Sequence, residues 1–273
     1  SFGIVLGQSA FKNKSDYLGG NRWNLVNPEK PSIDYATGQV LDGVAQFGVY
    51  GGNNVEHRLS SLFGRVSYNF DERYMLQATI RRDGSSRFGT NNKYGTFPSV
   101  SLGWNVMNEK FMESTRNWLT NLKIRASWGK NGNDNIGDFR YTTLTSMGNN
   151  VLFGKDAIKY NGSKSNGLAN PDLKWEESEQ IDLGIDFGFF NNALTFTADY
   201  YKKKTNGMLM TMPIPSYVGE TKPIGNVGDM ENSGFEFELG YKWNIGDAKF
   251  AIKGNATYLH NELTYIGLED SFL

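Results

Sequence analysis

The chain has no cysteine, two histidines and seven prolines among its 273 residues. Without cysteine it can form neither a disulfide framework nor a thiolate metal site. Its net charge is −1, so no basic surface of the kind that binds nucleic acid is indicated. No apolar run approaches the ~18 residues that a membrane-spanning helix needs. This does not exclude a membrane protein that crosses the bilayer with β-strands, because such strands alternate apolar and polar residues and contain no long apolar run.

The clearest pattern in the sequence lies in His57–Arg82. Two runs, Leu62–Phe70 and Tyr74–Arg82, alternate apolar and polar residues, and successive side chains of a strand point to opposite faces. The short polar turn Asp71-Glu72 joins them, which predicts a β-hairpin. Its apolar face has aromatic residues at the turn end, and its polar face has full charges. That combination is typical of a transmembrane barrel, apolar toward lipid and polar toward a wet lumen.

The same alternation recurs along the chain and predicts nine strands. They are Ser1–Phe11, Leu62–Phe70, Tyr74–Arg82, Phe97–Val106, Leu119–Gly129, Trp175–Phe190, Ala193–Lys204, Asn232–Trp243 and Ala248–Asn261. Long and short connections alternate between them, as in bacterial outer-membrane barrels. The connection that agrees least well with this alternation is Met107–Trp118, where we expect a short helical turn capped by Asn108. We therefore predict an all-β fold, a section of an antiparallel transmembrane β-barrel with long extracellular loops and short periplasmic turns, in preference to a soluble β-rich domain.

This topology places many aromatic residues at the periplasmic strand ends, where an interfacial girdle belongs. They are Tyr68, Phe70, Tyr74, Trp118, Phe189, Phe190, Trp243 and Phe250. The lumenal face would carry both signs of charge, namely Asp182, Asp186, Asp199, Glu236 and Glu238 with Arg65, Arg81, Lys123, Arg125, Lys242 and Lys253. We expect these groups to pair across neighbouring strands rather than to act as a general acid and base.

Three long motifs carry a resemblance to a known family. They are NFDERYMLQATIRRDGSSRFG with FPSVSLGWNVMNEKFM, then NPDLKWEESEQIDLGIDFGFFNNALTFTADYYKKKTNGML, then IGNVGDMENSGFEFELGY. In this order they resemble the mid-barrel of the SusC/RagA-like TonB-linked outer-membrane transporters of Bacteroidota. The resemblance implies that residues 1–273 are an internal section, about nine strands, of a 22-stranded barrel, with the plug domain and the TonB box absent from this chain.

The resemblance also implies a function and partners. The parent protein would import glycans or peptides across the outer membrane, energised through TonB–ExbB–ExbD, with the ligand enclosed between its loops and a SusD-like surface lipoprotein. Two other functions stay open at this point: a passive porin or surface adhesin, and an outer-membrane hydrolase. The hydrolase would use His57 with the nearby Ser60 or Ser61, but no third residue that would orient the histidine is placed. We therefore expect no enzyme.

Candidate sites for metals are weak. The stretch 134–138 (DNIGD) fails the spacing of a calcium loop and lacks its terminal glutamate, so a turn is the simpler interpretation and no metal or other cofactor is expected. Aromatic residues in the predicted extracellular loops are better candidates, because flat rings stack on sugars or peptides while neighbouring amides bond to them. They could instead fold the loops back over the barrel. The candidate substrate-binding residues are Trp23, Tyr35, Tyr50, Tyr141, Tyr160 and Tyr217.

Overall fold

The computed structural model describes residues 1–29, 32–33, 36–41, 44–46, 48–52, 55–147, 151–155 and 157–267. The chain divides into two compact units. Unit 1 comprises Ser1–Ala10 and Leu59–Leu273, and unit 2 comprises Phe11–Arg58. Each unit is described by itself.

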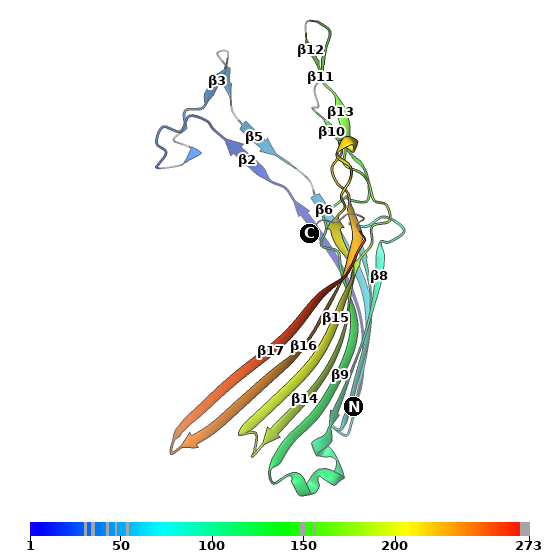
Figure 1. Cartoon of the computed structure of the whole chain (residues 1–273), viewed down its shortest axis with the longest axis vertical. Helices are drawn as coiled ribbons and strands as arrows, with labels where there is room; N and C mark the ends of the chain where they lie inside the picture. Colours follow the sequence, from blue (N-terminus) through cyan, green and yellow to red (C-terminus); the bar gives the residue numbers. More distant parts are fainter. Residues whose placement is uncertain are drawn as a thin grey trace. The chain divides into compact units, whose positions relative to one another are not determined.

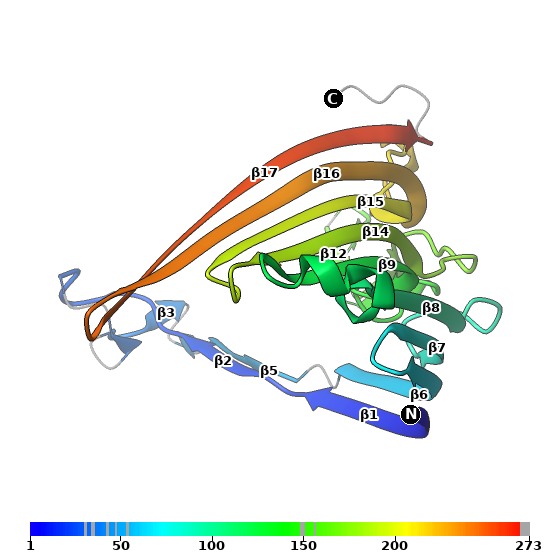
Figure 2. The same cartoon turned by 90° about the horizontal axis from the view of Figure 1, so that it is seen from below.

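Unit 1 is built on a nine-stranded sheet in the order β1-β6-β7-β8-β9-β14-β15-β16-β17 (Figures 1 and 2). The strands are β1 Phe2–Ser15, β6 Val55–Phe70, β7 Tyr74–Ser85, β8 Tyr94–Asn105, β9 Leu119–Asn133, β14 Glu176–Phe189, β15 Leu194–Thr211, β16 Ile224–Ile245 and β17 Ala248–Ile266. The registered pairs from β6 to β17 are all antiparallel. The predicted all-β antiparallel fold is confirmed, and each of the nine strands lies where the alternation placed it.

Two of the short turns follow directly from their residues. Arg73 N–H donates to the carbonyl of Phe70 at 2.9 Å, and the φ angles of Asp71 and Glu72 between them are 54° and 52°. Phe190, Asn191 and Asn192 have φ angles of 52°, 56° and 60°, and the N–H of Ala193 donates to the carbonyl of Phe190 at 3.1 Å, which makes Asn191 and Asn192 the central residues of the turn. Two successive positive φ angles define a type I′ turn, whose twist matches that of the flanking strands. The predicted tight turns at both positions are confirmed.

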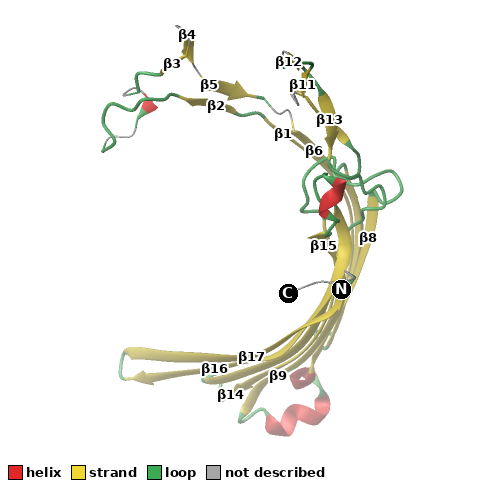
Figure 3. Ribbon diagram, turned by 45° about the horizontal axis from the view of Figure 1, so that its top comes forward, coloured by secondary structure: helices red, strands yellow, loops and turns green. Residues whose placement is uncertain are grey.

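The connections at the two ends of the sheet differ in length with one exception. Connections of 39, 8, 42 and 12 residues (16–54, 86–93, 134–175 and 212–223) join strands at one end, and connections of 3, 13, 4 and 2 residues (71–73, 106–118, 190–193 and 246–247) join them at the other. The predicted alternation of long and short connections therefore fails at residues 106–118, which outnumber both 86–93 and 212–223. Residues 106–118 contain two 3-10 helices, η2 Val106–Asn108 and η3 Lys110–Thr115, coloured red in Figure 3. The expected helical turn is present, but Asn108 as its cap is wrong. Glu109 precedes η3, while the Asn108 side chain donates to the carbonyl of Glu72 at 3.0 Å.

The long connections contain more strand than predicted. β15 and β16 extend to Thr211 and from Ile224, so the predicted loop of 27 residues shrinks to 212–223. These extensions lack clean alternation, because outside a membrane neither face has to be uniformly apolar. The 134–175 connection contains two short hairpins, β10 Leu144–Met147 with β13 Ser163–Asn166, and β11 Val151–Phe153 with β12 Ile158–Tyr160.

Unit 2 contains the outer parts of β1 and β6 and two small hairpins. β2 Leu18–Asn21 pairs with β5 Gly48–Gly51, and β3 Gln39–Leu41 pairs with β4 Val44–Gln46. Within this unit Lys12 forms an ion pair with Glu56 at 3.0 Å. Among the residues that the structure describes, no helix is both long and apolar enough to cross a membrane.

Candidate functional site

The two faces of the sheet in unit 1 differ in chemistry. Cross-strand partners on one face are apolar in a continuous row, from Tyr68 through Leu76, Leu102 and Ala126 to Leu183. Leu102 is 53% exposed and Leu183 is 51% exposed. Large apolar side chains left open over a whole sheet face require a covering that is itself apolar.

The apolar face has a defined height along each strand. Counted from the aromatic residue at one boundary to the interfacial residue at the other, it runs from Trp104 to Tyr94 on β8, from Phe189 to Glu179 on β14 and from Phe250 to His260 on β17, ten residues in each case. Ten residues of strand rise about 34 Å, and a tilt of about 40° reduces this to about 26 Å along the membrane normal. Outer-membrane barrels present an apolar band about 25 Å tall to lipid. The height of the apolar face therefore fits a bilayer.

A belt of charges closes the apolar face at the end of the long connections. We call it the outer belt: Lys130, Glu179, Lys202, Lys204 and Glu231. Glu231 pairs with Lys202 at 2.5 Å and with Lys204 at 3.5 Å. The indole nitrogen of Trp128 donates to Glu179 at 2.7 Å. Charged groups and indole N–H groups are stable at a membrane–water interface but not in hydrocarbon, so the belt marks one boundary of the band.

At the other boundary, aromatic rings form the expected girdle. Tyr74 stacks on Phe70 and on Trp104, with ring centroids 6.4 Å apart in both pairs. Glu109, 8% exposed, accepts hydrogen bonds from the Tyr74 hydroxyl at 2.6 Å and the Trp104 indole at 3.1 Å. These two bonds and the positive charge of Arg73 hold the pKa of Glu109 below its ordinary value. The carboxylate thus ties the hairpin turn to the 106–118 connection.

The opposite face is polar, and the predicted pairing of its charges across strands is confirmed for part of them. The guanidinium of Arg125 bonds to Asp186 at 2.8 Å and to Asp199, two strands away, at 2.9 Å. The second bond crosses Gly184, where an added Cβ would lie 2.3 Å from the Asp199 carboxylate. Lys253 pairs with a neighbouring-strand carboxylate at 2.7 Å. In the described structure five of the eleven predicted lumenal charges thus pair across strands, whereas Arg81 pairs with Asp83 of its own strand at 2.8 Å.

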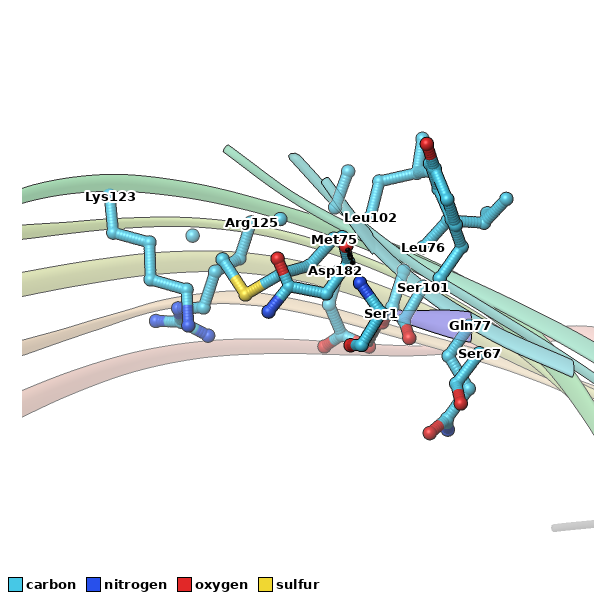
Figure 4. A pocket seen from close by; sticks show the side chains of 16 residues that line it. Ser1, Ser67, Met75, Leu76, Gln77, Ser101, Leu102, Lys123, Arg125 and Asp182 are labelled. Atoms are coloured by element: carbon cyan, nitrogen blue, oxygen red, sulfur yellow. Dashed lines mark hydrogen bonds between the residues drawn. The ribbon is translucent and has the colours of Figure 1, made fainter. Parts of the chain in front are cut away.

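A hollow of about 460 Å³ opens on this polar face (Figure 4). Ser67, Gln77 and Ser101 line it with hydroxyl and amide groups, and Lys123 and Asp182 contribute opposite charges. Figure 4 shows Leu102 on the side of the sheet opposite Gln77 and Ser67. The wall can therefore hydrogen-bond to water or to polar solutes, but it contains no arranged nucleophile and base. Within the described residues, no group of three or more His, Asp or Glu side chains could hold a metal ion.

The three sequence motifs meet at the base of the long connections. A buried cluster contains Phe88, Phe97, Ile136, Leu173 and Trp175. Leu173 is fully buried, and the ring of Trp175 lies 5.1 Å from that of Phe88 and 5.4 Å from that of Phe97. Phe88 belongs to the DGSSRFG motif, and Leu173 and Trp175 belong to NPDLKW. Sequence reasoning used these motifs for resemblance alone and missed that they form one core.

Hydrogen bonds extend this core into a platform for the loops. Arg87 bonds to the carboxylate of Asp138 at 3.2 Å and to the backbone carbonyl of Asp134 at 3.1 Å. Asn226, from the third motif, donates to the carbonyls of Lys174 at 2.9 Å and Gly207 at 2.8 Å. The interpretation of 134–138 as a turn region agrees with these contacts, since its two carboxylates face an arginine and a serine.

The predicted substrate-binding aromatics lie on separate segments. In unit 1, Tyr141 is half-buried in the 134–175 connection, Tyr160 is in β12, and Tyr217 is 89% exposed in the 3-10 helix η4 Ser216–Val218. In unit 2, Trp23 is 39% exposed and Tyr50 belongs to β5, whereas Tyr35 lies outside the described residues. Within unit 1 no described ring contact joins any two of Tyr141, Tyr160 and Tyr217, and within unit 2 none joins Trp23 to Tyr50. His57, the hydrolase candidate, lies edge-on to Phe11 in unit 2, with ring centroids 6.2 Å apart.

With this geometry in place, comparison with known proteins defines the class. The chain belongs to the family of TonB-dependent receptor-like β-barrels, whose family model matches residues 3–271. This is a family of receptors and transporters without enzymatic activity, and its SusC/RagA-like members are the ones this chain resembles, as the motifs indicated. These SusC/RagA-like relatives are outer-membrane β-barrel proteins of Bacteroidota.

Individual relatives support the same conclusion. The chain is 37% identical over 217 residues to the TonB-dependent receptor SusC of Bacteroides thetaiotaomicron, covering 78% of this chain and 22% of that protein. It is 39% identical over 215 residues to the TonB-dependent receptor P3 of Formosa agariphila, covering 79% of this chain and 21% of that protein. It superposes on the RagAB peptide importer in its closed-closed state with a TM-score of 0.82 and 27% identity, covering 99% of this chain and 28% of that one. The chain thus spans about a fifth of the length of the curated relatives it matches.

Proposed function

We propose that residues 1–273 form part of the barrel wall of a transporter in the outer membrane of a Bacteroidota bacterium. The observation that carries this proposal is the two-faced sheet. One face is apolar between boundaries about 26 Å apart, of which one is a charged belt, while the other face is polar and has ion pairs across its strands. This pattern suits a wall between lipid and a wet lumen.

The sheet has two open edges, β1 and β17. Unpaired backbone groups at a sheet edge are not tolerated in hydrocarbon, so other strands have to complete the barrel. We propose a 22-stranded closed barrel in the parent protein, to which this chain contributes nine neighbouring strands. A plug inside that barrel would connect it to TonB–ExbB–ExbD, which supplies the energy for import.

The relatives support a proposed substrate class and a proposed partner. RagAB is described as a peptide importer, which supports peptides as cargo, and glycans remain the other substrate class that the family resemblance suggests. A SusD-like surface lipoprotein would close over the loops and enclose the ligand. The aromatics Trp23, Tyr35, Tyr50, Tyr141, Tyr160 and Tyr217 are the proposed stacking surfaces for the cargo or for the surface that encloses it.

The test is uptake by whole cells that express the full-length parent. Fluorescent oligopeptides and oligosaccharides would be supplied to wild-type cells, to cells that lack the parent gene, and to cells that lack TonB. Import of one substrate class should require both genes. Uptake that needs the parent gene but not TonB would instead indicate a passive porin, and surface adhesion without uptake would indicate an adhesin.

A further inference from the structure

Three of the eight methionines of the chain lie within five residues, at the end of β15 on the side of the long connections (Figure 1). Met208 and Met210 belong to β15, and Met212 follows it. The backbone N–H of Met212 donates to the carbonyl of Pro223 at 2.8 Å, so backbone pairing continues to this residue. Because alternate residues of a strand point to the same face, the three thioether side chains form a row. We call Met208, Met210 and Met212 the methionine row.

The methionine row faces away from the hydrophobic core at the base of the long connections. Leu209 lies between two of its members and packs against the buried cluster that contains Leu173 and Trp175. Its neighbours Met208 and Met210 therefore point to the opposite face of the strand. All three methionines of the row are half-buried. Packing in that core does not explain why methionine occupies all three positions.

The sulfur atoms of the row lie over two buried glycines of β16. A Cβ added at Gly228 would lie 2.8 Å from the Met210 sulfur and 3.8 Å from the Met208 sulfur, so these two sulfurs gather at one place. A Cβ added at Gly225 would lie 2.6 Å from the Met212 sulfur. Because neither glycine has a side chain, the methionine side chains have room to turn, and each has three rotatable bonds. Small rotations can therefore bring the three sulfurs onto one ion.

The sulfurs of the row also keep their lone pairs for another partner. The sulfur of Met230 in β16 accepts a hydrogen bond from the side chain of Asn261 at 3.3 Å. Among the described residues, no such bond reaches the sulfurs of the methionine row. Met230 is therefore not counted as a member of the site.

A negative charge lies beside the row. The backbone N–H of Gly207, the residue before Met208, donates to the carboxylate of Asp229 at 2.8 Å. Asp229 itself follows Gly228 in β16. A carboxylate at this place favours a cation over a neutral or anionic ligand, because the thioether sulfurs have no charge of their own.

The chemistry of the sulfurs selects the kind of cation. Thioether sulfur is a soft donor and favours Cu⁺, whereas Mg²⁺ and Ca²⁺ prefer oxygen ligands and Zn²⁺ prefers thiolates and imidazoles. The chain has no cysteine, and its two histidines, His57 and His260, lie in β6 and β17. Met208 follows Lys204 of the outer belt by four residues, which is on the order of 10 Å beyond the boundary of the apolar band. Ions in water can therefore reach the row.

We propose that the methionine row is a binding site for a soft monovalent metal ion, Cu⁺ or its chemical analogue Ag⁺. The sulfurs of Met208 and Met210 hold the ion above Gly228, and Met212 supplies the third sulfur. Binding needs no change in the oxidation state of the ion and releases no proton, because a thioether carries none. Metal binding itself does not rest on the proposed function; only the location of the site outside the cell does.

The test uses the full-length parent protein, purified in detergent, with Ag⁺ and anaerobically maintained Cu⁺ as probes. Calorimetric titration measures the binding of Ag⁺, and competition with a coloured Cu⁺ chelator measures the affinity for Cu⁺. The triple variant Met208→Leu/Met210→Leu/Met212→Leu should bind one ion fewer than the wild type. Leucine is close to methionine in volume, so the fold should be kept. Met210→Leu alone should weaken the affinity by at least about tenfold, since even the loss of an outer-shell partner costs about 10–100-fold.

Met112→Leu/Met147→Leu/Met230→Leu is the matched control, because it removes the same number of thioethers from other parts of the chain. It should bind both ions as the wild type does. X-ray absorption at the copper edge should show sulfur neighbours of the bound ion in the wild type and in the control, and fewer in the triple variant. Heat-modifiable migration on gels checks that each variant keeps its folded barrel.

Three outcomes would overturn the proposal. The first is equal stoichiometry and affinity for both ions in the wild type and the triple variant. The second is an absorption spectrum of the wild type that shows nitrogen or oxygen neighbours alone. The third is a triple variant that loses binding of Zn²⁺ or Ca²⁺ while it keeps that of Ag⁺. None of these outcomes bears on TonB-dependent uptake by cells, so the proposed function is tested separately.

Discussion

The assignment of the two sheet faces can be tested with two neighbouring residues of β8. Val100, 37% exposed, lies on the apolar face opposite Ala78 and Trp128. Ser101, the next residue, lines the polar hollow. Each would be replaced by arginine in the full-length parent, so that the same charge is placed at nearly the same depth on opposite faces.

The expected difference follows from the depth of Val100. It is four residues from Trp104 at the inner end of the band, which is about 10 Å along the membrane normal at a rise of ~3.4 Å per residue and a tilt of ~40°. The centre of a band about 25 Å tall lies ~12 Å from that end. Arginine near the midplane on the lipid face costs about 2–4 kcal/mol. Arginine at Ser101 enters a hydrated hollow that Asp182 also lines, so its cost should stay below ~1 kcal/mol.

The assay is reversible urea unfolding of the refolded parent in lipid vesicles, followed by tryptophan fluorescence and by gel mobility. Val100→Arg should lower the free energy of unfolding by at least about 2 kcal/mol more than Ser101→Arg does. Equal losses, or a larger loss for Ser101→Arg, would show that the lipid and lumen faces have been assigned wrongly.

Three further predictions concern other parts of unit 1. Gly184→Ala should lower the free energy of unfolding by about 1 kcal/mol, measured by heat or urea, because the new Cβ displaces the ion pair that crosses this glycine. Gly103→Ala is the control and should lower it less, because its Cβ would meet only the flexible end of a methionine side chain, at 3.3 Å. Leu173→Ala should lower the stability of the loop base by about 3 kcal/mol, because the substitution leaves a cavity. Proteases should then cleave the loops faster while the barrel stays intact, and unchanged cleavage would contradict the role of the cluster. Cysteine at Asn91 in the 86–93 connection should react with an impermeant maleimide on intact cells, and cysteine at Asn192 should not; labelling at Asn192 without permeabilisation would reverse the topology.

The sequence by itself determined the nine strands of the main sheet, which face of each is apolar, and the tight turns. Alternation needs no tertiary information, because a period of two follows from the geometry of one strand and one face must meet lipid. The turns at Asp71-Glu72 and Asn191-Asn192 could likewise be predicted from local sequence. A connection this short between two antiparallel strands allows only a few turn geometries.

Only the tertiary structure decided what the long connections do. The core of Phe88, Phe97 and Trp175 joins segments that are far apart in the chain, and no local pattern reports such contacts. The extension of β15 to Thr211 could not be predicted from the sequence either. Outside the bilayer neither face of a strand has to be apolar, so the alternation of apolar and polar residues is lost there. The Arg125 bond across Gly184 depends on three strands lying in one register, and the positions of Tyr141, Tyr160 and Tyr217 in unit 1 depend on how its loops fold. Which face a side chain occupies depends only on its position along one strand, so the sequence alone could predict it. The core at the base of the long connections depends on contacts between segments that are distant in the chain, so the sequence alone could not predict it.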